Sequence, residues 1–170
     1  AKANKDIPRK RGLSVLDSEG PRARIAMCRS EKVNALNVAM IQELIDGLKW
    51  TARRSAGRQD ALEDENGRPY LRTLVLSGEG RHFCAGADIN MMRDAGANTP
   101  EENRADSKRL DRLFNGLWSH PCFTVATAPG VARGGGAGLL PCRDYAVSYP
   151  HLTLPAQVHT EMRVFERPWR

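Results

Sequence analysis

Aromatic residues are scarce in this sequence, making up 6% of its 170 residues. The scarcity affects how the positive charge of the chain is interpreted. Proteins that bind single-stranded nucleic acids combine a basic surface with aromatic side chains on which the bases stack. The net charge is +6 at pH 7, but the positive residues are scattered, with only short clusters at residues 9–11 and 53–54. We therefore expect no nucleic-acid partner. The surplus of lysine and arginine indicates a solvated basic surface or a phosphate-rich ligand.

Long hydrophobic runs are also missing. No segment approaches the about 20 apolar residues of a membrane-spanning helix. Residues 1–11 form a basic N-terminal extension without the apolar core of a signal peptide, and they are not rich in serine as a mitochondrial transit peptide would be. The sequence therefore predicts a cytoplasmic protein with no membrane partner.

Cysteine is limited to four residues with no Cys-x-x-Cys spacing: Cys28, Cys84, Cys122 and Cys142. Each lies in an apolar or small-residue run, where a free cysteine behaves as a small buried hydrophobe. We expect neither a disulfide nor a metal site. Cys84 is weighed as a catalytic thiol, but no histidine is clearly paired with it. Neither the Gly-x-Gly-x-x-Gly pattern of dinucleotide sites nor the P-loop pattern is present, so those two functions lose their main support.

The first half of the chain has the pattern of one α/β domain. Polarity alternates at residues 12–17 and 23–28, which predicts two neighbouring strands with a turn at 18–21. Asn37 can cap a helix that runs to about Arg53 and repeats apolar residues at helical spacing. The polar stretch 55–70 is predicted to be an inserted surface loop, exposed and poorly packed.

The second half continues the alternation of strands and helices. A strand is expected at 72–77, and Thr99 followed by Pro100 and Glu102 indicates a capped helix start. Pro121 ends this helix, a strand follows at 122–127, and another helix begins between Gly134 and Leu140. The order predicts crossover helices between strands. The apolar stripe of the Thr99 helix is interpreted as core and comprises Leu110, Leu113, Phe114, Leu117 and Trp118.

Two segments rich in small residues are the most informative feature. They are residues 83–89, FCAGADI, and residues 130–138, GVARGGGAG, and they follow the strand-like runs 73–77 and 123–127. A strand that breaks into small residues before a helix presents bare backbone N–H groups. Two such ends facing each other would direct two donors at one oxygen, which is the construction of an oxyanion hole. Either segment alone is also compatible with an ordinary tight turn.

The two segments resemble the signature regions of the enoyl-CoA hydratase/isomerase (crotonase) family. The resemblance is carried by HFCAGADI at residues 82–89, by GGGAGLL at 134–140 followed by CRDYAV at 142–147, and by NALN at 34–37. The last of these is similar to the turn that precedes the family's first long helix. The order of the motifs matches the family from about Gly12 to Val147.

The resemblance implies a crotonase-like fold, an α/β spiral of ββα units. Residues 12–148 would form a partial crotonase-like core, truncated before the C-terminal helical region of the family. After about Val147 the sequence matches nothing in the family, so we interpret residues 149–170 as a tail that replaces the missing part. Intact relatives are expected to form trimers or hexamers through their later helices, and without those helices this assembly is not expected here.

The resemblance also implies a site. The backbone N–H groups of Ala87 and Gly135 would hold the thioester oxygen, and glycine would be needed at 135 because a Cβ would crowd the acyl group. Asp88 is weighed as an acid or base, but its place at a helix start favours a cap. Arg133 could meet a phosphate or face water, and we favour water. The coenzyme A part of the substrate would lie against Ala85, Ala87, Asp88, Ile89, Asn90, Gly134 and Gly135.

The expected catalytic glutamates are missing. Gly138 occupies the position of the family's first glutamate and cannot transfer a proton, although relatives similar to methylglutaconyl-CoA hydratase also have glycine there. The run at residues 101–106 is reminiscent of that subgroup. The second glutamate should lie near Val158, where the sequence departs from the family. Glu161 is close in sequence, but a general base requires geometry rather than proximity in sequence.

The function implied is oxyanion-hole stabilisation of an enolate formed from an acyl-CoA thioester. Hydration of a 2-enoyl-CoA is the main prediction, with no cofactor besides the coenzyme A of the substrate. Two alternatives stay open. One is double-bond isomerisation on the same scaffold, and the other is a catalytically inactive fragment that at most binds acyl-CoA. Whether this chain is itself an enzyme is not decided, because both expected glutamates are absent.

Overall fold

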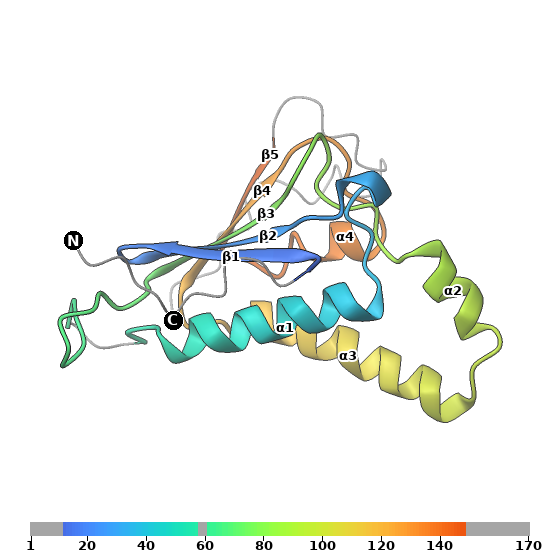
Figure 1. The fold of residues 1–170 in the computed structure, drawn as a ribbon, viewed down its shortest axis with the longest axis horizontal. Coiled ribbons are helices and arrows are strands. Elements are labelled where there is room, and N and C mark those ends of the chain that lie inside the picture. Colours follow the sequence, from blue (N-terminus) through green and yellow to red (C-terminus); the bar gives the residue numbers. More distant parts are fainter. Residues whose placement is uncertain (1–11, 58–60, 149–170) are drawn as a thin grey trace.

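The computed structural model describes residues 12–57 and 61–148. The predicted N-terminal extension 1–11 and tail 149–170, including Val158 and Glu161, lie outside the described residues. These described residues form five strands and four α-helices (Figure 1). In chain order the elements are β1 (Ser14–Glu19), β2 (Arg22–Met27), the short 3-10 helix η1 (Ser30–Lys32), α1 (Val38–Arg53), β3 (Thr73–Gly78), α2 (Ile89–Ala95), α3 (Pro100–Trp118), β4 (Phe123–Ala128), α4 (Gly135–Gly138) and β5 (Tyr145–Ser148).

The strands form one sheet in the order β1-β2-β3-β4-β5. β1 and β2 pair antiparallel as a hairpin, and every later neighbour pairs parallel, with Ile25 opposite Leu76 and Leu76 opposite Ala126. Parallel neighbours require a crossover between strands, and α1 and α3 occupy two of these crossovers. The predicted α/β architecture with crossover helices is therefore confirmed.

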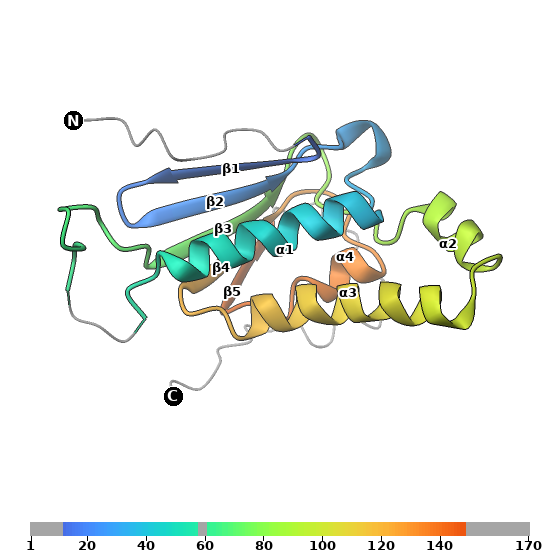
Figure 2. The same ribbon diagram turned by 60° about the horizontal axis from the view of Figure 1, so that its bottom comes forward.

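The core lies between the sheet and two long helices. α1 and α3 run beside each other on the same face of the sheet (Figures 1 and 2). The alternate residues of β3 and β4 that face them, such as Leu74, Leu76 and Ala126, are buried. Alternation with period two gives each strand one buried face, so the helices cover that face and bury it.

Both helix starts that the sequence indicates are present. The side chain of Asn37 caps α1 by accepting a hydrogen bond from the N–H of Met40 at 2.8 Å. Thr99 and Glu102 form a reciprocal capping box at the start of α3, with Pro100 as its first residue. The apolar positions predicted for α1 are buried and comprise Ile41, Leu44, Ile45 and Leu48.

The prediction that the aromatic residues of α3 are core is wrong for Trp118, whose exposed fraction is 48%. Leu113 and Leu117 lie at the centre of the buried stripe. Leu110, Phe114 and Trp118 form the neighbouring row at a spacing of four, so they lie at the edge of the stripe. Phe114 is half-buried there, and Trp118, the last residue of the helix, extends beyond the cover that the core provides.

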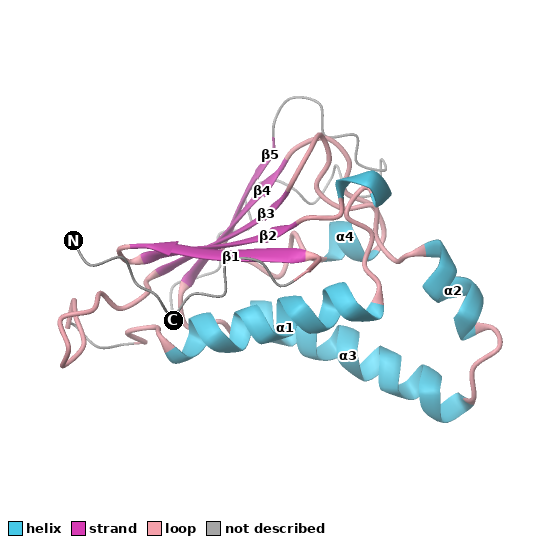
Figure 3. Cartoon of the chain, in the orientation of Figure 1, coloured by secondary structure: helices cyan, strands magenta, loops and turns pink. Residues whose placement is uncertain are grey.

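The boundaries of the hairpin strands differ from the prediction. These strands reach Glu19 and start again at Arg22, because Gly20 adopts a positive φ of 56° and makes a tighter turn than the predicted 18–21. The predicted loop 55–70 contains no helix or named strand in its described residues (Figure 3), and most of these residues are exposed as expected. Ala56 is an exception, because it is buried and its N–H donates to Leu71 O. The helix expected to begin between Gly134 and Leu140 begins at Gly135 and is a single turn, Gly135–Gly138.

Two further observations concern membrane spans and metal sites. Among residues 12–57 and 61–148, no helix combines the length and apolar composition that crossing a bilayer requires. In the same part of the chain, no three His, Cys, Asp or Glu side chains group in a way that could hold a metal ion. All four cysteines are free, with Cys84 and Cys122 buried as expected from their apolar surroundings.

Candidate active site

The two glycine-bearing segments lie side by side beyond the ends of β3 and β4. Cys84 and Ala132 form a parallel bridge. The N–H groups of Phe83 and Cys84 both donate to Val131 O, at 3.1 and 3.0 Å, and Arg133 N–H donates to Cys84 O at 3.0 Å. Because β3 and β4 are parallel neighbours, the segments that follow them leave the same edge of the sheet and can pair there.

Two glycines allow this close approach. A Cβ on Gly86 would lie 2.6 Å from Arg133 O, and Gly86 also has a φ of 95°. A Cβ on Gly136 would lie 2.6 Å from Cys84 O. Both distances are well below van der Waals contact, so a larger residue at either position would force the two segments apart.

A third segment, residues 34–37, pairs with the first of these two segments. Leu36 N–H donates to Gly86 O at 2.7 Å, and Asp88 N–H donates to Leu36 O at 2.9 Å, so Leu36 is bridged to Ala87. This pairing uses the backbone oxygen of Gly86 and the N–H of Asp88, the two residues on either side of Ala87. Within the described part of the chain, the N–H of Ala87 itself donates to no other residue.

Gly135 is close to this bridge. Its nitrogen lies 3.3 Å from the position that a Cβ on Gly86 would take, and its own Cβ position lies 3.6 Å from the Cδ1 atom of Leu36. Gly135 is the first residue of α4, and its N–H has no hydrogen-bond acceptor among the residues that the structure describes. The two N–H groups predicted to act together therefore belong to segments in direct contact.

No neighbouring atom in residues 12–57 and 61–148 requires glycine at positions 135 and 138. A Cβ at Gly135 would make an ordinary contact with Leu36, and a Cβ at Gly138 would lie 3.5 Å from the ring of Phe114. At 138, where the family resemblance places a glutamate, the chain has no carboxylate.

Asp88 is a helix cap, as the sequence favours. Its Oδ1 accepts a hydrogen bond from Asn90 N–H at 2.8 Å, and its Oδ2 accepts one from Arg29 Nη1 at 2.5 Å. The side chains of both charged residues are largely buried. The hydrogen bond from Arg29 holds the pKa of Asp88 below its ordinary value. An ionised carboxylate occupied in this way is a poor general base.

Two residues that position the site were missed from the sequence. Arg29 follows β2 and reaches Asp88. Asn34 is fully buried with a φ of 53°, and its side-chain Nδ2 donates to Glu79 O and His82 O, each at 3.0 Å. Asn34 thereby attaches the 34–37 segment to the loop after β3. Its place inside the NALN motif was a signal, because asparagine tolerates positive φ better than most residues do.

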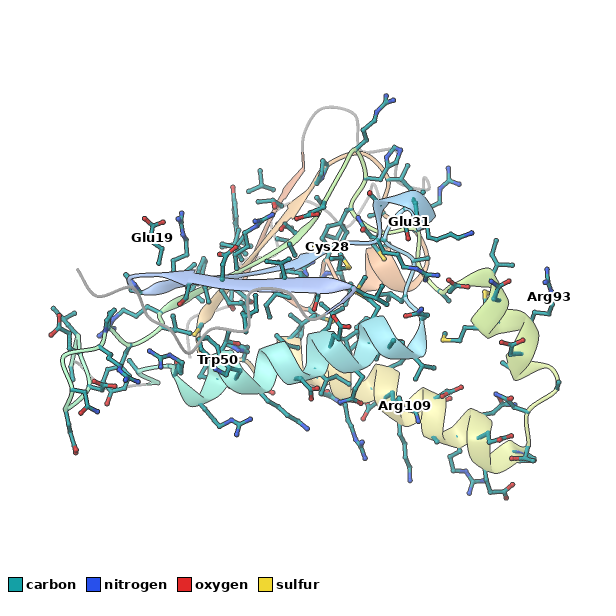
Figure 4. The ribbon with its side chains drawn as sticks, in the orientation of Figure 1. Glu19, Cys28, Glu31, Trp50, Arg93 and Arg109 are labelled. Atoms are coloured by element: carbon teal, nitrogen blue, oxygen red, sulfur yellow. The ribbon has the colours of Figure 1, made fainter. Side chains whose placement is uncertain are left out.

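The predicted lining residues are divided between a cavity and the surface. A cavity of about 340 Å³ opens beside Ala87 between the start of α1, α2 and the start of α3, and its lining includes Arg29, Asn37, Asp88 and Asn90. Ile89 is 72% exposed instead, and Gly134 and Arg133 are also exposed. Figure 4 shows this end of the molecule, with Arg93 of α2 directed toward solvent.

Cys84 lacks the properties of a nucleophile. Burial raises the pKa of its thiol to about 11, and its Sγ donates to Asn34 O at 3.1 Å. The reactive form of cysteine is the thiolate, which this environment disfavours near neutral pH. The interpretation as a small buried residue is the one that the structure supports.

The chain resembles known proteins over this region. Residues 23–151 match the family model for enoyl-CoA hydratase/isomerase. An enoyl-CoA hydratase of Alternaria alternata is 31% identical over 78% of this chain and 37% of its own length. A crotonyl-CoA hydratase of Syntrophomonas wolfei is 28% identical over 79% of this chain and 45% of its own length.

Solved structures of enoyl-CoA hydratases have the same fold over this region. The crystal structure of an enoyl-CoA hydratase from Shewanella pealeana superimposes with a TM-score of 0.70 and 32% identity, covering 81% of this chain and 46% of that one. The fold is therefore crotonase-like, as the motifs predicted. The chain spans less than half the length of these curated relatives.

Proposed function

Because the chain belongs to the enoyl-CoA hydratase/isomerase family, we propose that it binds an acyl-CoA thioester through the N–H groups of Ala87 and Gly135. We further propose that the reaction this site serves is hydration of a 2-enoyl-CoA. The observation that carries the proposal is the direct contact between segments 83–88 and 131–136, which contain Ala87 and Gly135, two residues whose N–H groups have no acceptor in the described part of the chain.

The chemistry follows from these two donors. When both N–H groups donate to the thioester oxygen, electron density moves from the double bond toward that oxygen. The β-carbon then becomes open to attack by water, and the enolate that forms is held by the same hydrogen bonds. A single donor of this kind typically contributes about 10²–10³ in rate. Coenzyme A enters as part of the substrate.

Proton transfer needs a further group. Within residues 12–57 and 61–148, position 138 has no carboxylate, and Asp88 is occupied by Arg29 and Asn90. Neither of these two positions therefore supplies an acid or base. This observation favours a second candidate, a chain that binds acyl-CoA thioesters and hydrates a 2-enoyl-CoA very slowly.

A pair of variants at one position tests the proposal. Gly135→Ala and Gly135→Pro both add a Cβ, but only proline removes the N–H, and proline is well tolerated at the first position of a helix. We expect crotonyl-CoA to bind the proline variant about tenfold more weakly than the alanine variant, as the loss of one hydrogen bond predicts. Free coenzyme A, which lacks the thioester oxygen, should bind both variants equally.

Titration calorimetry with the 170-residue chain measures these affinities, and absorbance of the conjugated thioester follows hydration. Equal affinity of the two variants for crotonyl-CoA would contradict the role of Gly135. Rapid hydration that Glu161→Gln abolishes would instead reject the binding-only candidate and assign the missing base to Glu161.

A further inference from the structure

His120 connects α1 to the turn between α3 and β4. Its ring nitrogen Nε2 lies 2.9 Å from Oγ1 of Thr51, in the last turn of α1. Its other ring nitrogen, Nδ1, accepts a hydrogen bond from Cys122 N–H at 3.1 Å. α1 and α3 run in the same direction, and their C-terminal ends lie away from α2 (Figure 2). The contact therefore joins the end of α1 to the residue that precedes β4.

The hydrogen bonds assign the proton of the neutral ring. Because Nδ1 accepts from Cys122 N–H, it carries no hydrogen, so the neutral ring has its hydrogen on Nε2. The hydroxyl of Thr51 donates to the carbonyl oxygens of Gly47 and Leu48, each at 3.0 Å, so its oxygen can accept from His120 Nε2–H. The neutral ring therefore satisfies the Cys122 N–H and the Thr51 hydroxyl together.

The protonated ring cannot keep both contacts. An imidazolium carries a hydrogen on each nitrogen, so its Nδ1–H would face the N–H of Cys122, one donor against another. Cys122 is 3% exposed and Thr51 is fully buried, whereas His120 is partly buried. A buried N–H that loses its acceptor costs free energy comparable to a lost hydrogen bond. Acid therefore destabilises the contact between α1 and the start of β4.

The surroundings determine how readily the ring takes up a proton. Burial lowers the pKa of His120 below its ordinary value, and the charge of Asp144, in the turn before β5, acts in the opposite direction. On α1, Lys49 and Arg53 are exposed, and the last turn of α3 contains no basic residue. The thiol of Cys122 is neutral near pH 7, because burial raises its pKa. The ring is therefore neutral in the folded protein at pH 7.

We propose that Thr51, His120 and Cys122 form an acid-sensitive latch, in which the neutral ring joins the end of α1 to the α3–β4 turn and the imidazolium releases it. The latch is independent of the proposed function, because its residues belong to neither glycine-bearing segment. Its release changes the stability of the fold and leaves the N–H groups of Ala87 and Gly135 in place.

His120→Asn tests the latch, because an asparagine side chain can accept from the N–H two residues later but does not titrate. Urea denaturation of the 170-residue chain from about pH 7.5 to about pH 5 gives the equilibrium constant of unfolding for both proteins. Relative to the variant, this constant should rise about tenfold for the natural chain, because below about pH 6.5 the unfolded chain binds a proton that the folded chain does not. All other titratable groups are shared, so their contributions cancel.

Two measurements on the natural chain need no variant. Nitrogen NMR at neutral pH should show the ring hydrogen of His120 on Nε2 and none on Nδ1. Hydrogen exchange, corrected for the intrinsic effect of pH, should show that the Cys122 N–H loses protection as His120 is protonated. The N–H of Val125, whose strand is paired on both sides, is the control and should keep its protection over the same range.

Each outcome decides for or against the latch. An equal dependence of unfolding on pH in the natural chain and His120→Asn overturns it, and so does a ring hydrogen on Nδ1 at neutral pH. Protection of the Cys122 N–H that stays constant while His120 titrates also overturns it. If His120→Asn does not fold, His120→Gln, whose amide can still donate to Thr51, replaces it in the denaturation experiment, and the two measurements on the natural chain stand.

Discussion

The two glycine-bearing segments leave the sheet in the same way but are held by different forces. In the first, the carboxylate of Asp88 caps α2 and pairs with Arg29, so side chains from distant elements determine its position. In the second, Gly134 provides no side-chain cap, and α4 has four residues. Close backbone packing holds this second segment, and that packing depends on glycine at 86 and 136.

Their buried charges differ as well. Asp88 has a guanidinium partner, whereas Arg143, in the turn after α4, is 3% exposed and makes no side-chain hydrogen bond within the described residues. Its guanidinium lies over the ring of Phe83, whose centroid is 5.8 Å from the Cζ atom of Arg143. Burial lowers the pKa of Arg143 to about 9. The charge in the first segment is therefore compensated, whereas the charge that follows the second segment has no charged partner among the described residues.

The largest effect should come from the contact between the segments. Gly86→Ala or Gly136→Ala would place a methyl group 2.6 Å from a backbone oxygen of the facing segment. We expect each variant to lower the free energy of unfolding by about 3 kcal/mol, because the backbone must shift to remove the overlap. Urea denaturation measures the change.

Gly135→Ala is the matched control for these variants. Its new methyl group would lie 3.6 Å from Leu36, an ordinary contact, so the free energy of unfolding should change by less than about 0.5 kcal/mol. If Gly86→Ala were as stable as Gly135→Ala, the close approach would not be what holds the second segment.

The next prediction concerns Arg143, whose replacement should raise the free energy of unfolding rather than lower it. Arg143→Met replaces a buried, uncompensated charge by an apolar side chain of similar length, so it should raise the free energy of unfolding by about 2 kcal/mol at pH 7. Arg112→Met, at an exposed position of α3, should change it by less than about 0.5 kcal/mol. A methionine variant less stable than the natural chain would show that Arg143 has a partner.

The gain from Arg143→Met should depend on pH. The pKa of Arg143 is lower in the folded protein than its ordinary value, so above about pH 9 the folded chain binds fewer protons at this site than the unfolded chain. The free energy of unfolding of the natural chain therefore increases as pH rises. The difference in this free energy between Arg143→Met and the natural chain becomes smaller. Burial raises the pKa values of Cys28 and Cys84 to about 11, which lowers stability at alkaline pH in both proteins, so that contribution cancels in the comparison.

The smallest effect concerns the compensated charge. Asp88→Asn keeps a capping side chain whose amide oxygen can still accept a hydrogen bond from Arg29, but it loses the charge of the ion pair, so it should cost about 1 kcal/mol at neutral pH. Because the folded-state pKa of Asp88 lies below 3.8, the advantage of aspartate should be present above that pH and disappear as pH falls further. Stability measured for both proteins from pH 7 downward checks this. A difference that persists in strong acid would contradict the ion-pair explanation.

Features that depend on neighbouring residues were predictable. Asn37 and Thr99 cap their helices as expected, and the segments at 83–89 and 130–138 follow β3 and β4. The family resemblance was confirmed. The assignment of Ala87 and Gly135 as the donors to the thioester oxygen stays a prediction. The exposure of Trp118 was missed because helical spacing defines a stripe but not how far its cover extends.

Sequence alone determined the order of strands and helices, the helix caps and the places where the chain needs small residues, because these depend on backbone preferences within a few positions. Only the tertiary structure decided which distant groups meet. Arg29 and Asp88 are 59 residues apart, Asn34 and His82 are 48 apart, and Arg143 is buried by the packing of segments far from it in the chain. Such contacts depend on how the sheet and helices assemble, and local sequence carries no direct information about that assembly.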